Sequence, residues 1–538
     1  MFTNHGIKKL FQTKKKYNYF IFLFFITLII RYPYFNYSFN SDDAVYLNAA
    51  IELKNSILPY AGIADNSTGP LLYYSYFFLY YLFGQTIIGF KVAGSFLIFL
   101  NSWIVFKTLR EYFSEKFSFY FSSLFIIFVT HLYYQGFIIL PGHIAIFFSS
   151  LSLYFWIKKK ENFFLSGFFI SLAGLVKQSY IIVAFILGLY LFFTYFKKNY
   201  KFLLSFILGG LLSLLIICFP YILLNKFSLF LENFFSSSWV FSCNFIITDE
   251  CYQDFRTYMY RPNTLLEGFP RFLMVLLNLQ YFTISSFLSF FILIVVFFNK
   301  ILNRNLFNKS FLSFEKKIYL FFFSVAASIL LHNAQQTHHF IELVPFLILV
   351  LAINFKDLKL FFLFFIFIVS LIPVIQSYNK FFFDKSILIE DKIVSYMRNN
   401  SSAKDQIFYF SSTPTLNNII LNKKYAVNNT YTNLIYRPKQ YEKLFGEKIN
   451  YNNYFNDLQK KDVTYLILKQ PLPGTSKIFE NPLSEILKEF NLEAGLLNNF
   501  LNSYDVATIL TEEYSHRYIK DFYQEKKHTN YYYIYKRN

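Results

Sequence analysis

Long apolar runs recur along the chain from near its start to about residue 378, and short polar segments separate them. A helix needs about 20 mostly apolar residues to cross a bilayer, so we interpret these runs as membrane spans. The pattern predicts about eleven, near residues 17–35, 86–106, 117–134, 138–157, 163–177, 180–196, 202–224, 272–298, 318–333, 339–355 and 358–378. The sequence therefore predicts an α-helical polytopic membrane protein.

The pattern changes after residue 379. The remaining chain has no apolar run of span length and alternates short β-like segments, such as DQIFYF and DVTYLIL, with helix-like ones, such as NPLSEILKEFNL. We therefore predict a transmembrane domain at 1–379 and a soluble α/β domain at 380–538. Two long loops, 36–85 and 225–270, are predicted on the same side of the membrane as this second domain.

Composition and charge agree with a membrane location. The chain of 538 residues is 55% hydrophobic and only 15% charged, which is too apolar for an ordinary soluble protein. A net charge of +19 on its own would suggest a nucleic-acid partner, but the Lys and Arg residues gather in alternate loops such as KKLFQTKKK, KTLREYFSEK, KKKEN and KKNYK. Basic loops stay in the cytoplasm, so we predict a cytoplasmic N-terminus, an extracytoplasmic C-terminal domain and no nucleic-acid binding.

The N-terminus and the cysteines add two smaller predictions. The basic start and apolar core of the first span resemble a signal peptide, but no small-residue cleavage site follows, which predicts a retained anchor. Cys218 lies inside an apolar run, where packing explains it. Cys243 and Cys251 share one predicted outer loop, so a disulfide and two free thiols are both open there.

Acidic side chains concentrate in the first outer loop, 36–85. Asp42 and Asp43 stand directly after the first span, in FNSDDAVYLN, and Asp65 precedes a Gly-Pro turn, after which we predict an aromatic helix at the membrane interface. Helix capping accounts for Asp43 about as well as a functional role does, and turn formation accounts equally for Asp65. Asp42 is less well explained by capping, so it is the strongest candidate for chemistry.

Cations and histidines are predicted on the same side. Lys177, in AGLVKQSY, interrupts two short apolar runs, and an ionisable residue there is either a functional group or a lysine that snorkels to the interface. His338 and His339, in QQTHHFIELVPF, precede Glu342 by about one helical turn. This spacing suits either a metal ligand pair or interfacial hydrogen bonds. Arg261, on the long outer loop, is open to anion contact or solvation.

This combination suits the transfer of a group from a lipid phosphate to an acceptor hydroxyl. A carboxylate takes the proton of the acceptor, and cations stabilise the departing phosphate. A soluble nucleotide sugar is not normally available outside the membrane, whereas a lipid-linked sugar is. Two alternatives are a flippase or transporter for lipid-linked glycans, which should carry charges along a midplane path, and an O-antigen polymerase or ligase, which would use the late outer loop.

Several of these motifs together resemble a known family. SDDAVYLNAAIELKNSILPYAGIADNSTGPLLYY is similar to the first outer loop of C-type glycosyltransferases of the protein O-mannosyltransferase and lipid A aminoarabinose-transferase type. GLVKQSY resembles the lysine-containing turn of that family, and HHFIELVPFLILVLA resembles its late H-Y-x-L-x-x-P helix. At residues 66–68, NST stands where many relatives carry a lysine, which gives Lys177 more weight.

The resemblance implies an inverting transferase of the bacterial plasma membrane, active in cell-envelope glycan biosynthesis. Such an enzyme moves a sugar from a polyprenyl-phosphate donor to a hydroxyl of a lipid, glycan or protein. By this resemblance Asp42 is the general base, and Asp43 and Asp65 orient the acceptor or hold the loop.

The resemblance also assigns the donor side of the reaction. Lys177 and His339 are implied as groups that bind the donor phosphate, and we add Arg261 of the long outer loop to them as a third candidate. No organic cofactor is implied. A divalent metal is left open, with three candidate ligands: Asp42, His338 and Glu342.

Overall fold

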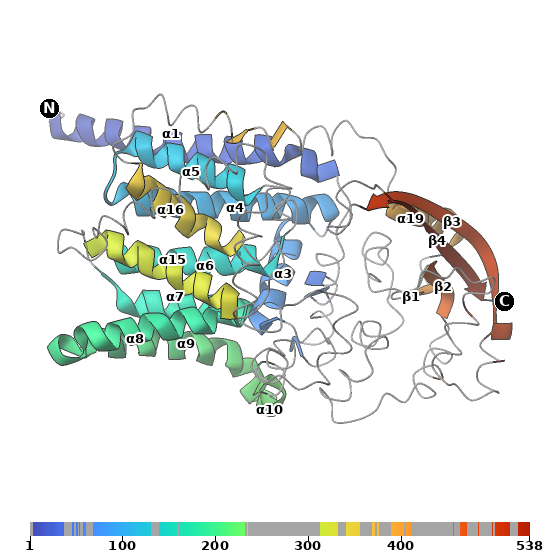
Figure 1. The fold of residues 1–538 in the computed structure, drawn as a ribbon. Helices are drawn as coiled ribbons and strands as arrows, with labels where there is room; N and C mark the ends of the chain where they lie inside the picture. The colour runs from blue at the N-terminus through green and yellow to red at the C-terminus, as the bar shows by residue number, and fades with distance from the viewer. Residues whose placement is uncertain are drawn as a thin grey trace.

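The computed structural model contains a helical part and a β-sheet, with strands β1–β4 apart from the main group of helices (Figure 1). It describes residues 4–36, 68–84, 86–130, 139–158, 161–231, 313–331, 341–355, 389–402, 405–410, 463–470, 501–516 and 526–537, together with a few single residues and short pieces between them. The statements below concern these residues.

The helical part consists of helices, most of which run roughly alongside one another (Figure 1). They are α1 (Asn4–Arg31) with the short 3₁₀ helix η1 (Tyr32–Asn36), α3 (Pro70–Leu82), α4 (Ile87–Arg110), α5 (Glu115–Val129), α6 (Pro141–Ile157), α7 (Phe163–Val176), α8 (Tyr180–Asn199), α9 (Lys201–Leu223), α10 (Phe227–Leu231), α15 (Ser313–Leu331) and α16 (Val344–Asn354).

The helices coincide with most of the predicted spans. Four segments of the described chain are long and apolar enough to cross a membrane: Asn18–Phe35, Ile88–Arg110, Tyr180–Lys197 and Lys201–Leu223. Three shorter apolar helices are Pro141–Ile157, Phe163–Val176 and Ile341–Asn354. The predicted span 272–298 and most of 358–378 lie outside the described residues, so the number of eleven spans stays a prediction.

The centre of the bundle is aromatic. Trp156 of α6 is fully buried, and its ring lies within 5.2–6.2 Å of rings from α7, α8, α9 and α15: Phe163, Tyr190, Phe206 and Phe321. Three of these four contacts are edge-on, the arrangement that the charge distribution of aromatic rings favours. One side chain therefore joins five helices.

Helices α7 and α9 pack with their backbones in close approach. A Cβ atom at Gly167 would lie 2.0 Å from the carbonyl oxygen of Phe206, and one at Gly209 would lie 2.0 Å from that of Phe164. Only glycine fits at such positions, and small residues at helix contacts are the usual way in which membrane helices gain van der Waals contact. Cys218 is buried on α9 as a free thiol, as its apolar surroundings predict.

Three of the basic loops meet at one end of the bundle. The ring of Tyr112, between α4 and α5, stacks on Phe314 at the start of α15, with centroids 3.8 Å apart. The same tyrosine donates a hydrogen bond to the Ile157 carbonyl at 2.5 Å, and Lys317 of α15 forms an ion pair with Glu161. Helices therefore alternate in direction as the loop charges predict, while the orientation in the membrane stays a prediction.

The C-terminal part contains a four-stranded mixed sheet with strand order β1-β2-β4-β3. Its elements are α19 (Ile389–Asn400), β1 (Gln406–Phe410), β2 (Val463–Gln470), β3 (Tyr504–His516) and β4 (Lys526–Arg537). β1 and β2 are parallel, and the other two pairs are antiparallel. Residues from α19 and the strands share one small core: Ile393, Met397, Ile407, Tyr465, Ile467 and Ile534.

This sheet confirms DQIFYF and DVTYLIL as strands β1 and β2. Almost all of NPLSEILKEFNL lies outside the described residues, so its helix stays a prediction. The domain limits 1–379 and 380–538 also stay predictions.

Candidate functional site

Two of the predicted site residues, Lys177 and Glu342, belong to the described structure. The others lie outside it, and so do both loop cysteines: Asp42, Asp43, Asp65, Arg261, His338, His339, Cys243 and Cys251. The roles predicted for these eight residues stay predictions. The geometry of the site is therefore built on Lys177, Glu342 and the described chain around them.

Lys177 occupies the short break between α7 and α8. Its amide donates to the Ala173 carbonyl at 2.9 Å and closes α7, while its own carbonyl accepts from the Tyr180 amide at 3.0 Å and opens the turn into α8. The backbone of Lys177 is extended, with φ −141° and ψ 114°. The break thus falls where the sequence places a polar Lys-Gln-Ser step between two apolar runs, as predicted.

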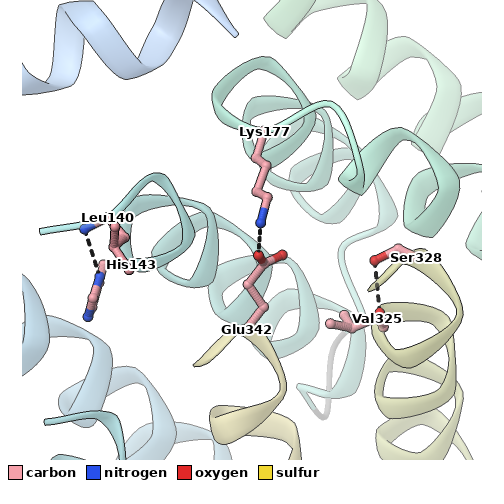
Figure 2. Close-up of polar contacts among 6 residues, drawn as sticks. All are labelled: Leu140, His143, Lys177, Val325, Ser328 and Glu342. Carbon is pink, nitrogen blue, oxygen red and sulfur yellow. Dashed lines mark hydrogen bonds and ion pairs between the residues drawn. The ribbon is translucent and has the colours of Figure 1, made fainter. Parts of the chain in front are cut away.

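The ammonium of Lys177 forms an ion pair with the carboxylate of Glu342. Figure 2 shows the two side chains pointing at each other, one from the end of α7 and the other from the residues before α16. The Glu342 side chain is 0% exposed, whereas that of Lys177 is 13% exposed. A buried carboxylate is stable only when it is paired, which this contact achieves.

Pro345 explains why Glu342 sits ahead of the helix. Residues 341–343 form a 3₁₀ turn, and α16 begins at Val344 with the proline in its first turn, where a missing amide hydrogen costs little. Among the described residues, the α-helix therefore starts later than the predicted span 339–355. The irregular turn directs the glutamate toward α7 and α6.

The start of α6 lies against Glu342. A Cβ atom added to Gly142 would lie 3.3 Å from Cγ of Glu342, 3.6 Å from its Oε1 and 3.2 Å from Cγ2 of Ile341. The absent side chain at position 142 lets the glutamate pass the first turn of α6. Because the amino end of a helix carries partial positive charge, this position also favours an ionised carboxylate.

The end of the first outer loop joins the same place. The Gly69 amide donates to the Val176 carbonyl at 3.0 Å, and a Cβ atom at Gly69 would lie 1.9 Å from the Leu175 carbonyl oxygen. The Tyr60 hydroxyl holds the preceding residue by donating to the Thr68 carbonyl at 2.9 Å. The three segments TGP (68–70), GLVKQSY (174–180) and IELVPF (341–346), far apart in sequence, therefore meet at one point.

The energy of the ion pair limits what Lys177 can do. Removing one partner of a buried pair costs about 3–5 kcal/mol, because the other charge then stays buried without compensation. The value belongs to the lower part of that range here, since the lysine is partly exposed. Lys177 therefore stays beside Glu342 unless another positive charge takes the place of its ammonium.

A second cluster of buried cations was not predicted. Arg31 at the end of α1 and Lys91 in the second turn of α4 are 1% and 6% exposed. The Arg31 Nε donates to the Ser95 hydroxyl at 3.0 Å, and Lys91 Nζ donates to the Tyr34 carbonyl at 2.8 Å. The sequence carried a signal for both residues, because an ionisable residue inside a membrane span is a functional candidate. Arg31 lies in the predicted span 17–35 and Lys91 in the predicted span 86–106.

His143 was also not among the residues predicted from the sequence. It is buried in the first turn of α6, where its Nδ1 accepts a hydrogen bond from the Leu140 amide at 3.0 Å, also drawn in Figure 2. A neutral imidazole that accepts at Nδ1 carries its proton on Nε2. This histidine therefore caps its own helix.

The described residues hold no group of three His, Cys, Asp or Glu side chains that would form a metal site. Of the three candidate ligands, only Glu342 is described, and the Lys177 ammonium contacts its Oε1. Whether Asp42 and His338 bind a metal stays a prediction.

Comparison with known proteins identifies the fold. No protein-family model matches the sequence, and no curated protein matches it significantly. The structure is similar to that of ArnT from Cupriavidus metallidurans in its apo state, with a TM-score of 0.59 and 9% identity over 97% of this chain and 98% of that one. An oligosaccharyltransferase from Archaeoglobus fulgidus matches with a TM-score of 0.49 and 12% identity, over 84% of this chain and 69% of that one.

This chain has the C-type glycosyltransferase fold. The likeness to ArnT covers nearly the whole chain, so it extends over the helices and the C-terminal sheet alike. Together with the four span-length helices, the C-type fold makes this an integral membrane protein.

Proposed function

We propose that this protein is an inverting membrane glycosyltransferase that moves a sugar from a polyprenyl-phosphate donor to an acceptor hydroxyl. The observation that carries the proposal is the meeting of Lys177 with the end of the first outer loop at Gly69. A cation and the most acidic outer loop then belong to one site. The C-type glycosyltransferase fold supports the same chemistry.

In the proposed reaction, Asp42 removes the proton of the acceptor hydroxyl while that oxygen attacks the anomeric carbon of the sugar. The bond from this carbon to the phosphate oxygen breaks, and the lipid phosphate leaves with the electron pair. Lys177, His339 and Arg261 stabilise the charge on the departing phosphate. Asp43 and Asp65 orient the acceptor or hold the loop, and the reaction takes place on the extracytoplasmic face.

The distribution of buried charge supports an enzyme over a transporter. The described buried Asp, Glu, Lys and Arg side chains lie at or within five residues of a helix end: Arg31, Lys91, Glu315, Lys317 and Glu342. A path for a charged headgroup through the membrane would need such groups near the middle of helices.

The direct test supplies the purified protein with radiolabelled polyprenyl-phosphate sugars and a lipid and glycan extract as the source of acceptor hydroxyls, and it measures donor consumption. We expect consumption by the wild type and none above background by Asp42→Asn. The matched control is Asp505→Asn, an exposed aspartate on β3, which should leave the rate unchanged. Wild-type turnover by Asp42→Asn would contradict the role of Asp42. Movement of the donor from one leaflet of a vesicle membrane to the other, without consumption, would favour a flippase.

A further inference from the structure

The two partners of the Lys177–Glu342 pair differ in what can reach them. The glutamate side chain is fully buried, while part of the lysine side chain remains exposed. An anionic ligand can therefore reach part of the lysine side chain but not the carboxylate. Of the two residues, only Lys177 can contact a substrate directly.

Two modes of action are conceivable for Glu342. It could compete with a ligand phosphate for Lys177, or it could stay in place and support the lysine. Competition would take the Lys177 ammonium away from a fully buried carboxylate, which is costly. The first turn of α6 also lies against Glu342 at Gly142, so the side chain has little room to turn away. Packing and charge both favour support.

Lys177 is then fixed at both ends of its side chain. Its backbone is held by the hydrogen bond to Ala173, and the neighbouring Val176 carbonyl accepts from Gly69 of the first outer loop. Its ammonium is held by Glu342. A lysine side chain that is ordered before the ligand arrives loses less conformational entropy on binding, which strengthens binding without any added contact.

We propose that Glu342 is a positioning residue for the lipid-phosphate donor, because it holds the Lys177 ammonium beside the end of the first outer loop for contact with the phosphate. This inference rests on the proposed function. It predicts that Glu342 acts on donor binding only through Lys177.

The test measures binding of a polyprenyl monophosphate without sugar to the full-length protein in detergent. We expect Lys177→Met and Glu342→Gln each to weaken binding by about tenfold or more, as for the loss of a hydrogen bond to a charged group. The double variant should bind no more weakly than Lys177→Met alone. Glu342→Asp, which keeps the charge on a shorter side chain, should restore part of the affinity.

The matched control is the ion pair at the opposite end of the bundle. Lys317→Met removes the partner of Glu161 and should leave the affinity for the lipid phosphate unchanged. Thermal unfolding of every variant shows whether the protein remains folded, and Glu342→Asp provides the measurement if Glu342→Gln does not fold.

The outcomes separate the two proposals. Wild-type affinity in Lys177→Met would remove Lys177 from the donor site and overturn the inference with it. Weak binding by Lys177→Met alongside unchanged or tighter binding by Glu342→Gln would overturn only the role of Glu342. Additive losses in the double variant would do the same, because they would show an effect that does not pass through Lys177.

Discussion

The ammonium of Lys177 is paired with the carboxylate of Glu342, although the two residues are 165 positions apart in the chain. This contact ties the break between α7 and α8 to the turn that precedes α16. It also links two motifs that the sequence presents separately, one with a lysine and one with two histidines and a glutamate.

The pair should show strong thermodynamic coupling. We expect Lys177→Met to lower the free energy of unfolding by about 3 kcal/mol, because it removes the Lys177 ammonium from the buried Glu342 carboxylate. Adding Glu342→Gln removes that charge, so the double variant should lose about 1–3 kcal/mol less than the two single losses combined. Thermal or denaturant unfolding of the four proteins in one detergent measures the coupling. Simple additivity would show that the two charges do not interact.

Gly69 is required for close approach rather than for an unusual backbone, since its φ is −75°. A methyl group there would collide with the Leu175 carbonyl oxygen, so Gly69→Ala should break the contact between the first outer loop and the Lys177 turn. We expect a loss of about 1–3 kcal/mol of stability and faster proteolysis within the loop.

Gly174→Ala is the control for that experiment. Its added Cβ would meet Ile181 Cγ1 at 3.4 Å, an ordinary contact, so stability and proteolysis should stay close to those of the wild type. Equal behaviour of Gly69→Ala and Gly174→Ala would contradict the close approach.

Two adjacent glycines of α9 offer a sharper contrast. A Cβ at Gly209 would lie 2.0 Å from the Phe164 carbonyl oxygen, whereas one at Gly210 would meet nothing nearer than 3.8 Å. Gly209→Ala should therefore separate α7 from α9 and destabilise the protein by about 1–3 kcal/mol. Gly210→Ala should be neutral or stabilising by up to about 1 kcal/mol, because alanine favours the helix. Thermal unfolding in detergent distinguishes them, and the opposite order would show that the helix contact is misplaced.

Ser95 is predicted to stabilise the protein because its hydroxyl binds the buried Arg31 side chain. Its hydroxyl accepts the Arg31 Nε hydrogen bond and donates to the Lys91 carbonyl at 3.0 Å. Ser95→Ala removes an acceptor from a buried guanidinium, so we expect a loss of about 1–3 kcal/mol.

Ser123→Ala is the matched control for Ser95. Both serines are buried, but the Ser123 hydroxyl donates to the Phe119 carbonyl within its own helix, so its loss should cost well under 1 kcal/mol by comparison. Equal unfolding midpoints for the two variants would mean that Arg31 does not depend on Ser95.

Local sequence features predicted a large part of the architecture. The apolar runs located the helices, the Gly-Pro step located the start of α3 at Pro70, and the polar step at Lys177 located the break between α7 and α8. These features act over a few residues, through burial of apolar side chains and through the missing amide hydrogen of proline. They can therefore be recognised without the rest of the fold.

The sheet shows where such local evidence ends. Two of its strands, β1 and β2, were predicted, whereas β3 and β4 were not. β4 lies between β2 and β3, although β3 precedes it in the chain. Strand order depends on which edges meet after the chain has folded back, and alternation along one strand carries no information about its neighbour.

By itself the sequence determined that this is an apolar, many-helix chain with alternate basic loops and an acidic loop after the first span, because hydrophobicity and charge are properties of single residues. Only the tertiary structure decided that Glu342 meets Lys177, that Gly69 joins their site and that Arg31 lies beside Ser95. Those contacts depend on which helix ends come together. Helix packing determines that, through glycine contacts and buried aromatic rings distributed over the whole chain.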